Sequence, residues 1–114
     1  MALFGKKKNE YEEASKNLSK DIPASDRLIM EKLNDNDERA AQLVQELKQG
    51  NPLILNFEDL DALAANKLLA FFAGACYALE GRNVKINENT YLFARIVDFF
   101  DGTLQAFIDH LPRG

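Results

Sequence analysis

Hydrophobic and polar residues alternate along this chain in segments that are typical of strands and helices. RLIMEKL, residues 27–33, is a short apolar run without helix caps, which predicts a strand. In the next segment, residues 34–51, apolar side chains recur at intervals of three and four residues, which predicts an amphipathic helix. Asp35 and Glu38 have the spacing of a capping box, and Gly50 stands where helices commonly end.

A second strand and a longer helix follow. PLILNF, residues 52–57, is a compact apolar run that begins with proline, a residue tolerated at the first position of a strand. Asp61 is the expected N-cap of a helix that continues to about Glu80 and ends at Gly81. This helix carries a broad apolar stripe, formed by Leu68, Phe71, Phe72, Ala75, Cys76 and Leu79.

The rest of the chain predicts a hairpin and a terminal helix. NVKI, residues 83–86, and TYLFARIV, residues 90–97, are separated by NEN, which is typical of a turn between two strands. The apolar residues that follow extend the predicted last strand to about Phe100. A terminal helix capped by Asp101 then carries on one face Leu104, Phe107, Ile108 and Leu111.

The predicted order of strand, helix, strand, helix, strand, strand and helix indicates an α/β fold of the α+β sandwich type. The first strand–helix–strand unit implies a right-handed parallel crossover, and the hairpin implies an antiparallel part, so the sheet is mixed. Two helices pack on one face, and we expect the other face to be left to solvent or to a partner. Residues 26–114 form this domain, residues 9–25 are interpreted as a flexible linker, and residues 1–8 form a separate apolar-basic segment.

Composition narrows the class of protein. The 114 residues suffice for one domain, and a hydrophobic share of 46% is ordinary for a globular protein. A net charge of −4 argues against nucleic acid as a main partner, because phosphates select basic patches. The single cysteine excludes an internal disulfide framework, and no apolar run approaches the roughly 20 residues of a membrane span. These features indicate a small, soluble, acidic protein of the reducing cytoplasm.

Residues with catalytic potential are few, and each has a simpler structural explanation. His110 is the only histidine, and as a general base it would need a nucleophile in a structured pocket. Cys76 lies on the apolar stripe of the long helix, where packing is a commoner role than redox chemistry. The carboxylates of FEDLD, residues 57–61, suit a helix N-terminus better than a metal site. We therefore predict no enzyme activity, no cofactor and no metal site.

The N-terminal octapeptide combines apolar and basic side chains. Near an anionic leaflet each lysine contributes about 1 kcal/mol, and apolar side chains can insert at the interface. One copy binds weakly, but several copies on an oligomer bind far better. The alternative is that the segment is only a charged tail. The candidate membrane residues are Met1, Leu3, Phe4, Lys6, Lys7 and Lys8.

Small residues interrupt the middle of the most hydrophobic helix, in the sequence AGA around Gly74. A glycine inside a helix costs about 1 kcal/mol relative to alanine, so its presence needs a reason. Small residues let two helices approach closely, which predicts that a second copy of the same helix packs here. The alternative is that Gly74 accommodates a neighbouring strand. The candidate self-association residues are Gly74, Phe71, Ala75 and Ala78.

A large part of the chain resembles a known family. GNPLILNFEDLDALAANKLLAFFAGACYALEGRNVKINENTYLFA, within a region from about Arg27 to Ala94, is similar to the core of the bacterial cell-division family SepF. The resemblance rests on a strand ending in NFEDLD, a helix containing AFFAGACYALEG and a hairpin ending in YLF. The apolar-basic start followed by a polar linker also fits the layout of that family.

The resemblance implies a cytoplasmic adaptor. SepF-like proteins attach to the inner face of the cell membrane at the division site through an N-terminal amphipathic segment, and their domains form homodimers and higher oligomers. The domain binds the C-terminal peptide of FtsZ, the tubulin-like division GTPase, and so tethers FtsZ filaments to the membrane. Lys85 and Tyr91 match the peptide-contact positions, and Phe93 on the same hairpin is a further candidate. Gly74 matches a glycine at a helix–helix contact between subunits.

The chain departs from the family pattern after the hairpin. ARIVDFF continues without the usual Ser/Thr-Pro turn, so we expect a longer last strand or a bend elsewhere. The apolar residues 96–111 are then available to cover a surface that other members leave free. Two other function classes stay open on the residues alone: a small α/β ligand-sensing regulatory dimer without FtsZ binding, and a divergent enzyme built around Cys76 or His110.

Overall fold

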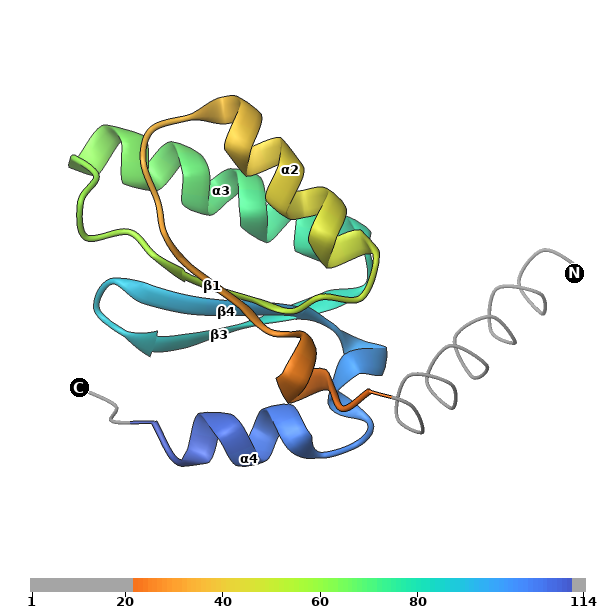
Figure 1. Cartoon of the computed structure of the whole chain (residues 1–114). Coiled ribbons are helices and arrows are strands. Elements are labelled where there is room, and N and C mark those ends of the chain that lie inside the picture. Colours follow the sequence, from red (N-terminus) through yellow and green to blue (C-terminus); the bar gives the residue numbers. More distant parts are fainter. Residues whose placement is uncertain (1–21, 112–114) are drawn as a thin grey trace, which may run out of the picture.

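The chain folds into a mixed four-stranded sheet with helices on both sides, and the structure, a computed structural model, describes residues 22–111 (Figure 1). The elements are η1 (Ala24–Arg27), β1 (Ile29–Lys32), α2 (Asp37–Lys48), β2 (Leu53–Asn56), α3 (Ala62–Ala78), β3 (Gly81–Asn87), β4 (Thr90–Arg95), η2 (Ile96–Phe99) and α4 (Thr103–Asp109). This order confirms the predicted fold class. The first described element begins at Ala24, two residues before the expected start of the domain.

The strands lie side by side in the order β1-β2-β4-β3. β1 runs parallel to β2, with Ile29 opposite Leu53, as expected for strands joined by a crossover helix. β4 is antiparallel to both of its neighbours, and its Tyr91 pairs with Leu55 on one side and with Lys85 on the other. The predicted parallel crossover and hairpin are therefore both confirmed.

α2 and α3 cover one face of the sheet (Figure 1). Side chains two residues apart on a strand point the same way, so Leu53, Leu55 and Phe93 all turn toward these helices. Fully burying one leucine or phenylalanine side chain stabilises the fold by about 1.5–3 kcal/mol, so this cluster fixes α3 firmly on the sheet. The buried residues on this side are Leu33, Ala40, Leu43, Leu47, Leu53, Leu55, Phe57, Leu68, Phe72, Cys76 and Phe93.

The prediction that the second sheet face is left to solvent or to a partner is wrong. η1 and α4 lie along that face, as Figure 1 shows. The buried residues there are Ala24, Ile54, Ile86, Leu92, Ala94, Leu104 and Ile108. The physical reason is that β2 and β4 are apolar at successive positions, so that both of their faces need cover. The expectation that residues 96–111 cover a surface of the domain is met.

β4 is shorter than predicted. It ends at Arg95 rather than near Phe100, and the chain turns into the 3-10 helix η2. Arg95 Nε donates a hydrogen bond to Asp98 Oδ2 at 3.0 Å. In a strand these residues would stand about 10 Å apart along the chain, so the contact requires the turn. The buried Asp98 carboxylate also accepts from Arg27, at 3.3 Å from Nη2, and thereby joins η2 to η1.

The first turns of α2 and α3 are capped by side chains. Asn36, rather than Asp35, caps α2, because its Oδ1 accepts a hydrogen bond from the Arg39 amide at 3.0 Å. Asp61 caps α3 as predicted, and its Oδ1 accepts from the Ala64 amide at 2.8 Å. Both caps satisfy amides that a helix leaves without partners at its start.

The end of α3 differs from the prediction because Gly81 has another task. α3 ends at Ala78, and Glu80 takes the left-handed conformation, with φ of 56°. Gly81 instead opens β3. A Cβ at Gly81 would lie 2.5 Å from Cys76 Sγ and 2.7 Å from the Ala94 carbonyl oxygen, so close packing against α3 requires glycine there.

The start of α4 is tied to η1. Gly102, with φ of 79°, occupies the N-cap position that the sequence predicts for Asp101. The Asp101 carboxylate instead accepts hydrogen bonds from the Thr103 amide at 2.9 Å, the Thr103 hydroxyl at 2.7 Å and the Ala24 amide at 2.9 Å. Asp101 therefore positions the first turn of α4 and the first residue of η1 together.

Candidate functional site

The outward side of α3 is apolar along most of its length. Leu63 and Tyr77 are 83% and 85% exposed, and Phe71 is also exposed between them. These positions and Gly74 are separated by three or eight residues, so they lie on the side of the helix that faces away from the sheet. Large contiguous apolar patches commonly mark contacts with other molecules, so this side of α3 is a candidate contact surface. We call Leu63, Phe71, Gly74, Tyr77 and Ala78 the α3 face.

Gly74 lies within the α3 face with open space in front of it. A Cβ built at Gly74 would meet no atom within 4 Å among the described residues. The alternative that this glycine accommodates a neighbouring strand is therefore wrong. Of the other candidate self-association residues, Phe71 and Ala78 are exposed and Ala75 is half-buried. A glycine costs a helix about 1 kcal/mol relative to alanine. Packing inside the domain does not explain why this position carries one.

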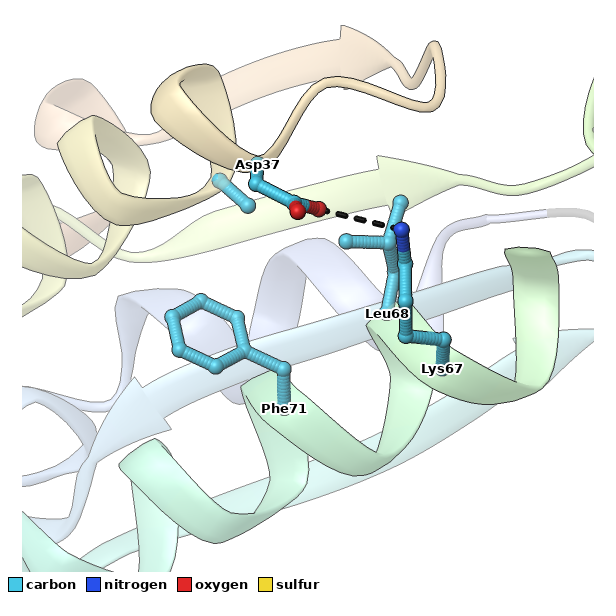
Figure 2. Close-up of a pocket in the computed structure, with 5 residues that line it drawn as sticks. Asp37, Lys67, Leu68 and Phe71 are labelled. Carbon is cyan, nitrogen blue, oxygen red and sulfur yellow. Dashed lines mark ion pairs between the residues drawn. The ribbon is translucent and has the colours of Figure 1, made fainter.

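A shallow pocket of about 320 Å³ borders the α3 face on the side of α2. It is lined by Asp37, Ala40, Lys67, Leu68 and Phe71, and Figure 2 shows Lys67 turned toward Asp37 across the gap between the two helices. Lys67 Nζ lies 3.0 Å from Asp37 Oδ1 and 2.6 Å from Asp35 Oδ1. Hydrogen bonding to Asp35, and then to Asp37, raises the pKa of Lys67. The lysine therefore stays charged and joins α3 to the start of α2.

Lys85 and Tyr91 are brought together by the hairpin. They are direct partners in the register of β3 and β4, so both side chains lie on the helix side of the sheet. Lys85 is exposed and its Nζ lies 3.8 Å from Glu88 Oε2. Tyr91 is half-buried and packs at the border of the helix-side core. A cation beside an aromatic ring at the surface suits a peptide that carries both carboxylates and apolar side chains.

Phe93, the third candidate residue of the hairpin, is buried, whereas Lys85 is exposed and Tyr91 is half-buried. Phe93 has 0% exposure and lies inside the core, with its ring stacked on that of Tyr91 at a centroid distance of 6.4 Å. Phe57, a residue that the sequence does not single out, meets Tyr91 edge to face at 5.7 Å. The two phenylalanines therefore hold the tyrosine ring in position from two sides. Only the packing of the rings reveals Phe57, because it lies far from Tyr91 in the sequence.

The residues with catalytic potential are engaged in structure. Cys76 is buried, and burial raises the pKa of its thiol, which donates to the carbonyl oxygens of Arg82 and Ala94. A thiol of this kind is a weak nucleophile, because the thiolate is the reactive form. His110 Nδ1 lies 2.7 Å from the Ala106 carbonyl oxygen on the same helix turn.

The acidic segment FEDLD is used for capping and for an ion pair. Asp61 caps α3, while Glu58 and Asp59 lie 2.9 Å and 3.9 Å from Lys32 Nζ. Within residues 22–111 the structure holds no group of three or more His, Cys, Asp or Glu side chains arranged for a metal ion. The acidic cluster therefore has a structural explanation for each of its carboxylates.

The candidate membrane residues Met1, Leu3, Phe4, Lys6, Lys7 and Lys8 lie outside the described residues. Across the part of the chain that the structure does describe, none of the helices combines the length and the apolar character needed to span a bilayer.

A known family matches the region of the chain that contains the α3 face and the Lys85–Tyr91 pair. Residues 31–94 match the family model described as Cell division protein SepF, and this match covers more than half of the chain. The chain belongs to the SepF family. The resemblance read from NFEDLD, AFFAGACYALEG and YLF is thereby confirmed. The SepF region contains α2, β2, α3 and β3 entire, so the α3 face and the Lys85–Tyr91 pair both lie within it, whereas η1, η2 and α4 lie outside.

Relatives named Cell division protein SepF include the three described next. That of Carboxydothermus hydrogenoformans is 34% identical over 67 residues, which cover 59% of this chain and 49% of the relative. Those of Symbiobacterium thermophilum and Coprothermobacter proteolyticus are each 37% identical, over 57 and 60 residues. These matches cover 50% and 49% of this chain, and 28% and 43% of the relatives. The chain therefore spans half the length of these relatives or less.

Proposed function

We propose that this SepF-family protein is a cell-division adaptor without catalytic activity. It binds the C-terminal peptide of FtsZ and tethers and bundles FtsZ filaments at the inner face of the cell membrane. The observation that supports this most directly is that one small domain of this family presents two separate exposed surfaces, the α3 face and the Lys85–Tyr91 pair. An adaptor needs such separate surfaces, since self-association and ligand binding must take place together.

Self-association occurs through the α3 face. With no side chain at Gly74, a second copy of α3 can approach the helix backbone closely, and Phe71 and Ala78 then pack at the sides of the crossing. The exposed aromatic residues of this face supply apolar area that a dimer buries. Higher oligomers multiply the number of peptide sites and membrane segments in one particle.

The FtsZ peptide binds beside the hairpin. Lys85 pairs with a carboxylate of the peptide in place of Glu88, which is itself exposed, and the Tyr91 ring supplies an apolar wall. Phe93 acts from below as a positioning residue that supports the tyrosine ring. A single shallow site of this size binds weakly, so the strength of the tether comes from several copies acting together.

Membrane attachment occurs through residues 1–8, with Leu3 and Phe4 at the lipid interface and Lys6, Lys7 and Lys8 against anionic head groups. The decisive experiment is co-sedimentation with anionic liposomes in the presence of FtsZ, comparing the full-length protein with a version that lacks residues 1–8. We expect FtsZ to pellet only with the full-length protein, and FtsZ without its C-terminal peptide to stay in solution. If the protein binds FtsZ but brings none to lipid, it is a bundling factor and the tethering role is wrong.

A further inference from the structure

The exposed apolar side chains of the domain gather in two places. Apart from those of the α3 face, and Met30 on β1, the large exposed hydrophobic residues of the described chain are Ile22, Ile96 and Phe100. A hydrogen bond brings the backbone near Ile22 close to that near Phe100, and Ile96 and Phe100 are joined by the single turn of η2. The Ala24 amide, two residues after Ile22, donates to Asp101, which directly follows Phe100. We call Ile22, Ile96, Phe100 and the adjoining Arg82 the entry patch, because the described chain enters the domain there (Figure 1).

The base of the entry patch is held rigidly. The Asp98 carboxylate, fully buried, accepts from Arg27 of η1 and from Arg95 at the end of β4. Arg27 also donates to the Gly50 carbonyl oxygen at 2.8 Å, which fastens η1 to the loop after α2. A buried carboxylate held between two guanidinium groups gives η1 and η2 a fixed relative position. The exposed Ile96 and Phe100 therefore stand on a firm support rather than on a loose loop.

Charged groups of both signs lie at this end, with Glu80 beside Ile96 in the backbone pairing, so apolar contact has to carry the binding. Arg82 is exposed, and its guanidinium lies 5.3 Å from the centre of the Phe99 ring, beside Phe100. The buried Asp98 carboxylate is paired with Arg27 and Arg95, Asp101 accepts hydrogen bonds from Ala24 and Thr103, and Asp26 in η1 is exposed. An exposed phenylalanine and isoleucine with an adjacent arginine suit the lipid–water interface, where rings and aliphatic chains insert and a guanidinium meets phosphates.

We propose that the entry patch is a second membrane contact, by which the folded domain rests on the anionic lipid surface next to its anchor. This inference rests on the proposed membrane attachment through residues 1–8. The intervening residues 9–21 reach at most about 45 Å even when fully extended, so an anchored chain keeps the entry end close to the bilayer. Contact of the patch then follows binding of the anchor as an intramolecular step.

The first test uses tryptophan as a reporter, because the sequence contains none. Phe100→Trp in the full-length protein places the only indole in the patch, and Met30→Trp places it at an equally exposed site on β1, since Phe100 and Met30 are 58% and 60% exposed. With vesicles of phosphatidylglycerol and phosphatidylcholine that carry brominated acyl chains, we expect quenching and a blue shift for Trp at position 100 alone. Equal quenching at both sites, or at neither, contradicts the inference.

The second test measures partitioning. Ile96→Ser combined with Phe100→Ser in the full-length protein should weaken binding to the same vesicles about fivefold, whereas Met30→Ser leaves it unchanged. If the double variant pellets like wild type while wild type still requires residues 1–8, the inference is wrong and the tether stands. If wild type itself stays in solution, the proposed tether fails first. If the double variant changes only the sedimentation of the protein alone, the patch is a contact between copies, which also overturns the inference.

Discussion

Gly74 is an exposed helix glycine that packing within the domain does not require. Its Cβ position is open, so alanine fits there without any clash within the described residues. Alanine is also the better helix former by about 1 kcal/mol. A glycine at such a site lowers the stability of the separate domain. We propose that contact with another copy through this glycine offsets that loss.

Substitutions at Gly74 separate these two effects. Gly74→Ala should raise the free energy of unfolding by about 1 kcal/mol, measured by urea denaturation of the dilute protein. Gly74→Lys should leave the domain folded and abolish higher assembly, because a long charged side chain prevents close approach of two helices. Sedimentation velocity checks the second result, and unchanged polymers of the lysine variant would contradict the assignment of the α3 face.

Lys85 carries the second prediction at the residue scale. Lys85→Glu should weaken binding of the FtsZ C-terminal peptide about tenfold or more, because the pair with a peptide carboxylate becomes a repulsion. Lys32→Glu is the matched control. Lys32 lies on β1, the opposite edge strand from that of Lys85, is equally exposed and is paired with Glu58. Fluorescence anisotropy with a labelled peptide gives both dissociation constants. A tenfold loss in both variants would indicate a general charge effect and not a hairpin site.

At the scale of elements, the structure couples the two ends of the described chain. η1 comes first and α4 last, yet the Ala24 and Ser25 amides donate to Asp101 and Thr103 at 2.9 and 3.0 Å. Together they cover the sheet face that the SepF region itself leaves apolar. Asp101 is central to this cover, because its carboxylate serves both elements.

Asp101 makes the attachment of η1 and α4 sensitive to acid. The pKa of this carboxyl is lowered from its ordinary value of 3.8: burial alone would raise it, but hydrogen bonds from the Ala24 amide and from Thr103 outweigh burial. Since the folded state releases the proton more readily, the stabilisation is complete above about pH 3.8 and is lost as the pH falls through the lower folded pKa. Urea unfolding across this range should show the advantage of wild type over Asp101→Asn shrinking with acid. The same comparison with Asp26→Asn, an exposed carboxyl of η1, serves as control.

At the scale of the whole molecule, the proposed tether is a product of weak contacts. In this proposal each copy contributes one membrane segment and one peptide site, and oligomerisation multiplies both. Weak single contacts also keep the assembly reversible, which suits a division ring that must be built and dismantled.

This arrangement predicts that a variant unable to oligomerise no longer recruits FtsZ to the membrane, although each single peptide site remains intact. Gly74→Lys should bind the FtsZ peptide as wild type does, yet bring FtsZ to anionic vesicles at least about a hundredfold less efficiently. Removal of residues 1–8 should have the same pair of effects for a different reason. Anisotropy measures the peptide affinity and co-sedimentation measures the recruitment. If the lysine variant recruits FtsZ normally, oligomerisation is not needed for tethering.

Local patterns predicted the elements well. The apolar stripes of α2 and α3, the Asp61 cap and the hairpin all depend on residues close together in the sequence, where periodicity and capping act. The same patterns failed at the end of β4, because Asp98 turns the chain through contacts with Arg95 and with the distant Arg27. The apolar run at the end of β4 does not indicate that Arg27 is a partner of Asp98.

The sequence by itself determined the order of the elements and the family, because both depend on local patterns and motifs. The pairing of Lys85 with Tyr91 came from the structure, since the hairpin register shifts between Lys85 and Asn87. Only the tertiary structure decided that the second sheet face is covered, that Phe57 and Phe93 support Tyr91, and that Gly74 faces open space. These features depend on which surfaces meet when separate elements pack. Such meetings are set by the shape and burial of residues far apart in the chain, and local periodicity does not record them.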